Sequence, residues 1–228
     1  MNTLQSLIII LLSIGVFVTW YSEALGSYIR IISMHSNRNV VGNSIVQATS
    51  VFSRLGFFMQ SFAFAWIIDS RLFMGHRLAL VLFCLSIVFG CLIFLNFFGR
   101  LSTQILFTLY HRFGIINKLE FDIAHIKPLN FKIKPKLSHV FAYFLLYFGS
   151  FSPLMIQMID VNFAARSVAL SGVINGISTI ILLSYIDVKY AHDLEDAGTS
   201  LIPIKLIAAR YYAVVILFII IMLMSFFK

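Results

Sequence analysis

Charged residues are scarce in this sequence: Asp, Glu, Lys and Arg make up 11% of its 228 residues, whereas 60% are hydrophobic. Soluble domains contain about 25% charged and 45–50% apolar residues. A soluble core of this size cannot hide so much apolar surface from water. The mean hydropathy of +0.95 therefore excludes a soluble enzyme, a nucleic-acid-binding module and a disordered chain, and it indicates a membrane protein with several spans.

Cysteine and recognisable catalytic motifs are also scarce. Cys84 and Cys91 are seven residues apart in one apolar run, which favours packing on one helix face over a disulfide or a metal site. The chain lacks Walker A, HExxH and GxSxG motifs. It has neither a nucleophile beside a base nor paired carboxylates inside the apolar runs. We therefore expect a carrier that has no catalytic residue, metal or cofactor, rather than an enzyme.

Six apolar segments are long enough to cross a bilayer, which takes about 20 helical residues. They cover residues 3–29, 40–68, 78–98, 138–159, 166–187 and 205–227. The sequence therefore predicts an all-α bundle of about six transmembrane helices in a single domain, residues 1–228. The first segment lacks the basic start and small-residue cleavage site of a signal peptide, so we expect it to be retained.

One long connection, residues 99–137, separates the third and fourth segments. Residues 101–116 are apolar but contain His111 and Arg112, which predicts an amphipathic helix at the membrane interface. Residues 125–136 form a basic loop. Lysine and arginine are concentrated here and in the connections between segments one and two and between five and six. The positive-inside rule then places these connections in the cytoplasm and both termini outside.

Polar residues recur at helical spacing in four of the six segments, which indicates faces directed at protein or water. Segments three and six have almost nothing polar in their middles. We therefore expect the four striped helices to share a polar cavity that segments three and six shield from lipid. The alternative is hydrogen bonding that only holds the bundle together, at about 0.6 kcal/mol per contact. The stripes are Thr19, Glu23, Ser27 and Arg30; Asn43, Gln47, Ser50, Arg54 and Ser61; His139, Tyr143, Tyr147, Ser150 and Gln157; and Ser167, Ser171, Asn175 and Ser178.

Arg54 is the most demanding of these residues, because it lies near the middle of its segment. An arginine at that depth costs about 2.5–3.5 kcal/mol even on insertion-based scales. Its guanidinium must therefore face protein or water. Glu23 and Arg54 either belong to a functional site or form a purely structural ion pair.

Corresponding positions in the two halves suggest an internal repeat. Asp69 and Asp187 close the second and fifth segments, while Glu23 and Asp160 close the first and fourth, each followed by a basic residue. This order predicts a 3+3 inverted repeat, which is typical of many transporters. Coincidence is the alternative, because acidic residues are common at membrane borders.

Two stretches of the chain are similar to the sequence pattern of a known protein family. The first runs from Tyr21 to Arg30 and precedes a helix that contains the pair Ser53-Arg54. The second runs from Leu170 to Thr179, with Asp187 closing the helix. Together with the six-helix plan, these stretches resemble the Amj family of bacterial lipid II flippases. The resemblance does not extend to the central loop, residues 99–137.

The resemblance implies a multi-pass flippase of the bacterial inner membrane that moves lipid II, a peptidoglycan precursor linked to undecaprenyl diphosphate. Arginines would bind the diphosphate, because a guanidinium contacts phosphate oxygens bidentately; amides would hydrogen-bond the sugars. Glu23 would hold Arg54 or Arg30 when substrate is absent, and Glu23 or Asp160 would carry a proton if transport is proton-coupled. The implied substrate-binding residues are Arg30, Arg54, Arg166, Asn43, Gln47 and Asn175.

Other functions remain open at this point. A transporter of another polyprenyl-linked or amphipathic substrate needs the same kind of cationic cavity. A membrane-embedded enzyme acting on a lipid diphosphate needs an aspartate cluster that holds magnesium. The one acidic set available, Asp187, Asp193, Glu195 and Asp196, has a spacing typical of no such site. A scaffold for other membrane proteins needs no buried arginine, so Arg54 argues against it.

Overall fold

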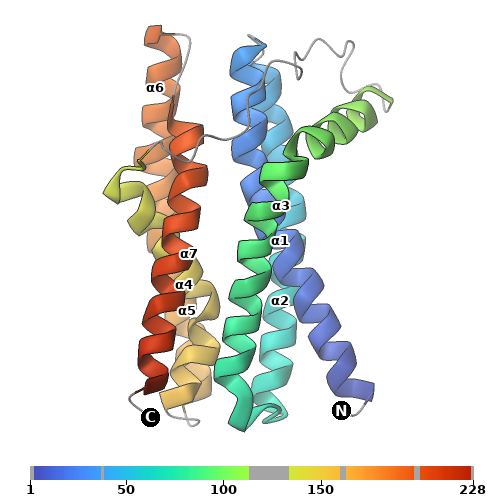
Figure 1. Cartoon of the computed structure of the whole chain (residues 1–228), viewed down its shortest axis with the longest axis vertical. Helices are drawn as coiled ribbons and strands as arrows, with labels where there is room; N and C mark the ends of the chain where they lie inside the picture. Colours follow the sequence, from blue (N-terminus) through green and yellow to red (C-terminus); the bar gives the residue numbers. More distant parts are fainter. Residues whose placement is uncertain (1–2, 37–38, 113–133, 160–162, 198–200, 227–228) are drawn as a thin grey trace.

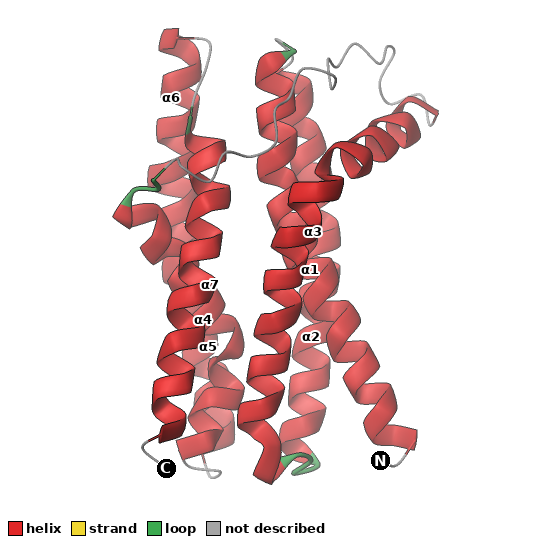
Figure 2. Cartoon of the chain, in the orientation of Figure 1, coloured by secondary structure: helices red, strands yellow, loops and turns green. Residues whose placement is uncertain are grey.

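The computed structural model describes residues 3–36, 39–112, 134–159, 163–197 and 201–226, and within these ranges no strand occurs (Figure 2). The long helices are α1 (Thr3–His35), α2 (Asn39–Asp69), α3 (Arg77–Arg112), α4 (Leu137–Ile159), α5 (Ala164–Ile181) and α7 (Ile202–Phe226). The shorter elements are the 3-10 helix η1 (Met74–His76), the π-helix η3 (Leu182–Asp187) and α6 (Val188–Ala197). Six spans are long and apolar enough to cross a membrane, which confirms the predicted polytopic helical bundle.

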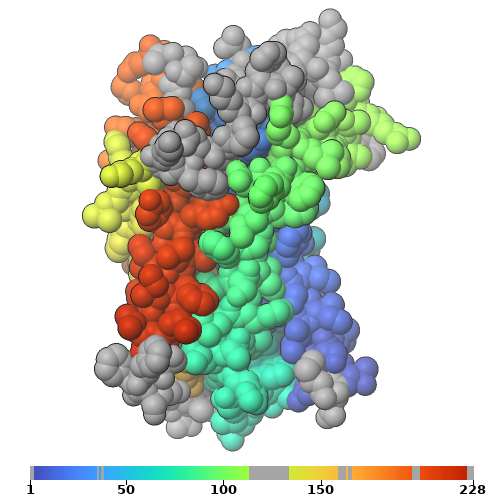
Figure 3. All heavy atoms as spheres, in the orientation of Figure 1, coloured from blue at the N-terminus to red at the C-terminus, as the bar shows by residue number. Residues whose placement is uncertain are grey.

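The long helices form two groups of three (Figure 1). In the N-terminal group α1 packs against α2 and α3, and in the C-terminal group α4 packs against α5 and α7. The groups meet where α7 lies against α1 and α3; Figure 3 shows the face on which α3 and α7 come together. Near the end of the bundle where α1 begins, the buried Arg77 of α3 donates a hydrogen bond to Gln157 of α4, a second link between the groups.

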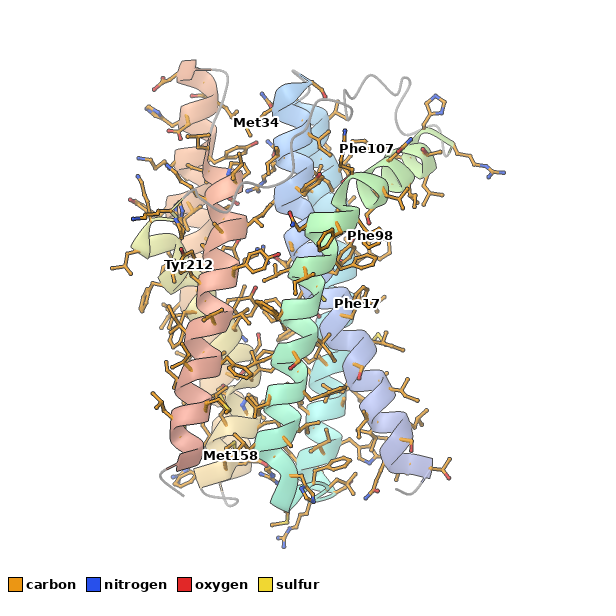
Figure 4. All side chains as sticks on the ribbon, in the orientation of Figure 1. Phe17, Met34, Phe98, Phe107, Met158 and Tyr212 are labelled. Atoms are coloured by element: carbon orange, nitrogen blue, oxygen red, sulfur yellow. The ribbon has the colours of Figure 1, made fainter. Side chains whose placement is uncertain are left out.

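The third span extends further than its sequence predicts. Residues 99–112 belong to the predicted connection and include most of the expected interfacial helix, residues 101–116; they are helical, but they continue α3 to Arg112 without a break. The final part of α3 bends away from the bundle (Figure 1), and Phe98 and Phe107 lie on the two sides of this bend (Figure 4). Phe107 is fully buried, so the bent part still packs against the protein. Residues 113–133, which include most of the predicted basic loop, lie outside the described residues.

Helices α1 and α2 cross at two glycines. A Cβ atom on Gly15 would lie 2.6 Å from the backbone nitrogen of Gln60, and one on Gly56 would lie 2.5 Å from the backbone nitrogen of Thr19. Both distances are shorter than any Cβ contact allows, so glycine alone permits this approach. Small residues serve this purpose in membranes, where helices associate by close packing.

Helices α4 and α5 are joined by hydrogen bonds to α4 carbonyl groups. Pro153 has no N–H with which to bond the carbonyl of Gly149 one turn earlier. That carbonyl instead accepts hydrogen bonds from the hydroxyls of Ser171 of α5, at 2.6 Å, and Ser152, at 2.9 Å. Ser178 of α5 donates to the carbonyl of Ala142 at 2.8 Å. Ser171 and Ser178 of the fifth span's stripe therefore hold α5 on α4.

We expect Gly56→Ala to destabilise the protein by about 1–3 kcal/mol, because the added methyl group overpacks the α1–α2 crossing. Gly90→Ala in α3 is the matched control, since a Cβ atom there meets nothing within 4 Å. Thermal unfolding of the purified variants in detergent measures the difference. Equal melting temperatures for the two variants would show that the crossing tolerates a side chain.

Candidate functional site

Two adjoining cavities form a cleft between α2 and α5, called here the α2–α5 cleft. The first cavity has a volume of about 340 Å³ and the second about 360 Å³. They share Glu23, Arg54, Leu146 and Thr179, so they lie side by side along the same helices. The side chains that line the cleft and carry charge are Glu23, Arg30, Arg54, Asp187 and Arg210.

The structure brings together five of the residues that the sequence selected. Glu23, Arg30, Gln47 and Arg54 line the first cavity, and Asn175 lines the second. All four polar-striped helices contribute to the cleft, as the stripes predict.

Three other selected residues are placed elsewhere. Asn43 is exposed on α2 and lines neither cavity. Arg166 is also exposed and outside the cleft, and its guanidinium lies 5.2 Å from the centre of the Phe163 ring. Asp160 lies outside the described residues.

Arg30 of α1 forms an ion pair with Asp187, the last residue of the π-helix η3. Their closest atoms, Nη1 and Oδ1, are 2.7 Å apart, and Nη2 lies 3.4 Å from Oδ2. The side chains of Arg30 and Asp187 keep 14% and 32% of their surface exposed. The Arg30 guanidinium also lies 5.1 Å from the centre of the Tyr190 ring. This pair connects the N-terminal group to the C-terminal group.

Glu23 of α1 contacts Ser53 and Arg210, so the expected pairing of Glu23 with Arg54 or Arg30 is wrong. Its Oε1 accepts a hydrogen bond from the Ser53 hydroxyl at 2.9 Å, and its Oε2 lies 3.5 Å from Nη2 of Arg210. The same Nη2 donates to the backbone carbonyl of Glu23 at 2.9 Å. Arg210 is fully buried, and its guanidinium stacks over the Tyr143 ring at 4.2 Å. A second ion pair thus connects α1 to the C-terminal group.

Sequence analysis missed Arg210, and it treated Asp187 only as a residue at a membrane border. Arg210 lies in the sixth segment, which was expected to be a featureless shield. The apolar residues that follow Arg210 dominate the mean hydropathy of that segment. The signal that selected Arg54, an arginine inside an apolar run, was also present at Arg210. The expectation that the sixth span only shields the cavity is therefore wrong.

The cleft carries an excess of positive charge. Three arginines face two carboxylates there, and Arg30 and Arg210 are each matched by one of them. Among the residues that the structure describes, Arg54 has no carboxylate partner. Arg54 is exposed and lines both cavities, where it can bind an anion or water. Within the same ranges no three His, Cys, Asp or Glu side chains lie close enough to share a metal ion.

The second cavity supplies uncharged groups beside this cation. Ser150 and Asn175 line it together with Trp20, Phe57 and Phe58. The side-chain oxygen of Asn175 is buried against Gly149 of α4 and has no hydrogen-bond partner. The second cavity therefore places amide, hydroxyl and aromatic groups beside Glu23 and Arg54, which line it too.

Comparison with known proteins gave no relative: no family model, no curated protein and no solved structure matches this chain.

We expect Arg210→Met to lower the stability by about 3 kcal/mol, because it leaves Glu23 without its counterion in a partly buried position. The double variant Arg210→Met/Glu23→Gln removes both charges and should recover part of this loss. Thermal unfolding of the two variants beside the unmodified protein measures the coupling. A double variant that is less stable than the single one would contradict the pairing.

Proposed function

We propose that this chain is a transporter that moves an anionic, lipid-linked substrate between the two leaflets of a membrane. The observation that supports this proposal is the α2–α5 cleft: a cationic cavity that lies within membrane-spanning helices and contains an unmatched arginine. A charge in the hydrocarbon region is costly and marks a substrate or ion pathway by default. A cleft between two peripheral helices suits a lipid, because its polar head can enter while its tail stays among the acyl chains.

The head of such a lipid finds suitable partners in the cleft. The Arg54 guanidinium offers paired N–H donors to phosphate oxygens, with Gln47 and Ser50 lining the same cavity. A sugar linked to the phosphate would lie in the second cavity beside Asn175 and Ser150. The remainder of a large head would extend out of the cleft into water.

The outer surfaces of α2 and α5 are suited to a lipid tail. Phe52 and Leu55 on α2, and Ile177 and Ile180 on α5, are large apolar side chains that the protein leaves exposed. A polyprenyl tail could pack against these side chains while the head crosses. Rocking of one helix group against the other would then expose the cleft to each side of the membrane in turn.

We further propose lipid II as the cargo and the bacterial inner membrane as the location. This choice rests on the resemblance of residues 21–30, 43–54 and 170–179 to the Amj flippases. It rests also on the match between a diphosphate-linked sugar and a cleft that places amide and hydroxyl groups beside arginines. Another polyprenyl-linked or amphipathic anion would use the same cleft. An assay of the cargo itself therefore decides between these substrates.

The test is to deplete the resident lipid II flippase of a bacterium and express this chain in its place. Lipid II that has reached the outer leaflet is labelled by an enzyme that cannot cross the membrane. We expect growth and labelled lipid II. An inserted protein that supports no labelling would overturn lipid II as the cargo.

In the same assay, Arg54→Gln should reduce labelled lipid II by about tenfold or more, because a hydrogen bond to a charged group contributes about 1.5–3 kcal/mol. Arg71→Gln is the matched control, since Arg71 is exposed in the turn after α2 and lines neither cavity. Immunoblots of the membrane fraction confirm equal protein levels. Full transport by the Arg54 variant would show that this cation does not bind the cargo.

A further inference from the structure

The charges of the α2–α5 cleft restrict the charge of the ligand that it accepts. Arg30 is matched by Asp187 and Arg210 by Glu23, which leaves the single positive charge of Arg54. A phosphodiester carries one negative charge, so Arg54 alone can match it while both ion pairs stay closed. A diphosphate linked at both ends carries two. Its second charge stays unmatched in a low-dielectric site unless one arginine leaves its carboxylate.

Of the two ion pairs, Arg30–Asp187 is the one that can open. Arg210 is fully buried and is also held by the backbone carbonyl of Glu23 and by the Tyr143 ring. The Arg30 side chain is 14% exposed, against 2% for Arg210, and no hydrogen bond from Arg30 to a backbone carbonyl accompanies its ion pair among the described residues. In addition, the buried Nε of Arg30 has no hydrogen-bond partner. Nε and Nη1 of Arg210 also have no hydrogen-bond partner, so it is the greater exposure of Arg30 that makes it the arginine an incoming phosphate reaches first.

The helix that carries Asp187 has a structure that can change register. Residues Leu182–Asp187 form a π-helix between α5 and α6, and such segments occur frequently at functional sites. A change of one residue in the helical register rotates a side chain by about 100° around the helix axis. Conversion of η3 to α-helix would therefore turn Asp187 away from Arg30 without unfolding the span.

We propose that the Arg30–Asp187 pair is a latch that selects substrates with two negative charges at the head. The inference rests on the transport function proposed above. A diphosphate lipid takes Arg30 from Asp187 and so releases one of the links between the two helix groups. A lipid with a single phosphodiester charge, such as a phospholipid or a polyprenyl monophosphate sugar, binds at Arg54, leaves the latch closed and is not moved.

The test uses the purified full-length chain in proteoliposomes. Two probes carry the same fluorescent sugar on the same polyprenol, one through a diphosphate and the other through a monophosphate. A quencher that cannot cross the membrane reports how fast each probe changes leaflet. We expect the unmodified protein to move the diphosphate probe about tenfold faster or more than the monophosphate probe, the ratio that one unmatched charge in the cleft produces.

Asp187→Asn should abolish this discrimination. The latch is then always open, so the monophosphate probe gains about tenfold in rate while the diphosphate probe keeps its rate. Glu195→Gln is the matched control, because it removes one negative charge from an exposed position on α6 outside the cleft. The charge-swapped variant Arg30→Asp/Asp187→Arg re-forms the pair and should restore discrimination.

The outcomes separate this inference from the proposed function. Movement of both probes at equal rates by the unmodified protein would leave transport intact and overturn the latch. Unchanged discrimination in Asp187→Asn would also overturn it. If Asp187→Asn does not fold, loss of discrimination in Arg30→Gln supports the latch, and retained discrimination there overturns it. Movement of neither probe by the unmodified protein would contradict the proposed function itself.

Discussion

The structure depends on how four charged groups are accommodated among the apolar helices. A charge in hydrocarbon must find a partner or water, and Glu23, Arg30, Asp187 and Arg210 find one another in two pairs. In both pairs one member lies on α1. This helix also packs against α2, α3 and α7, so it is the element around which both helix groups are arranged. The cleft lies where these paired charges and the unpaired Arg54 meet.

The two groups are built by different means. In the N-terminal group, Gly15 and Gly56 bring α1 and α2 into backbone contact, and close packing supplies the attraction. In the C-terminal group, Pro153 leaves a carbonyl free on α4, and serine hydroxyls of α5 bond to α4 carbonyls. One wall of the cleft is therefore fixed by shape over a long contact, and the other by a small number of directed hydrogen bonds.

Most of this arrangement can be predicted from the sequence. The length of each apolar run predicts a span, and the helical spacing of polar residues predicts which face of each helix is directed at protein or water. Five of the residues selected from the sequence line the cleft: Glu23, Arg30, Arg54, Gln47 and Asn175. That they bind substrate stays a prediction. Spacing does not show how far along a helix a cavity extends, so Asn43, one turn before Gln47, and Arg166, well before Asn175, were assigned to a cleft that ends before reaching them.

The spacing of residues along the sequence also does not show which charged side chains pair across helices. Arg210 and Asp187 are more than 150 residues from their partners along the chain, and which side chains meet depends on packing between the two groups. The π-helix that positions Asp187 leaves no trace in the hydrophobic pattern. Ser171 and Ser178 of α5 had the right spacing for a cavity, yet they bond to α4 carbonyls, and of the same stripe only Asn175 lines the cleft.

Helix α5 has one extensive neighbour, α4, and its remaining surface is largely exposed. In a bilayer that surface is covered by acyl chains, so lipid serves as the second packing partner of α5. A helix in this situation adjusts its tilt to the thickness of the surrounding hydrocarbon. The width of the α2–α5 cleft is therefore set in part by the membrane, and bilayers that differ in thickness should hold the same chain with differently open clefts.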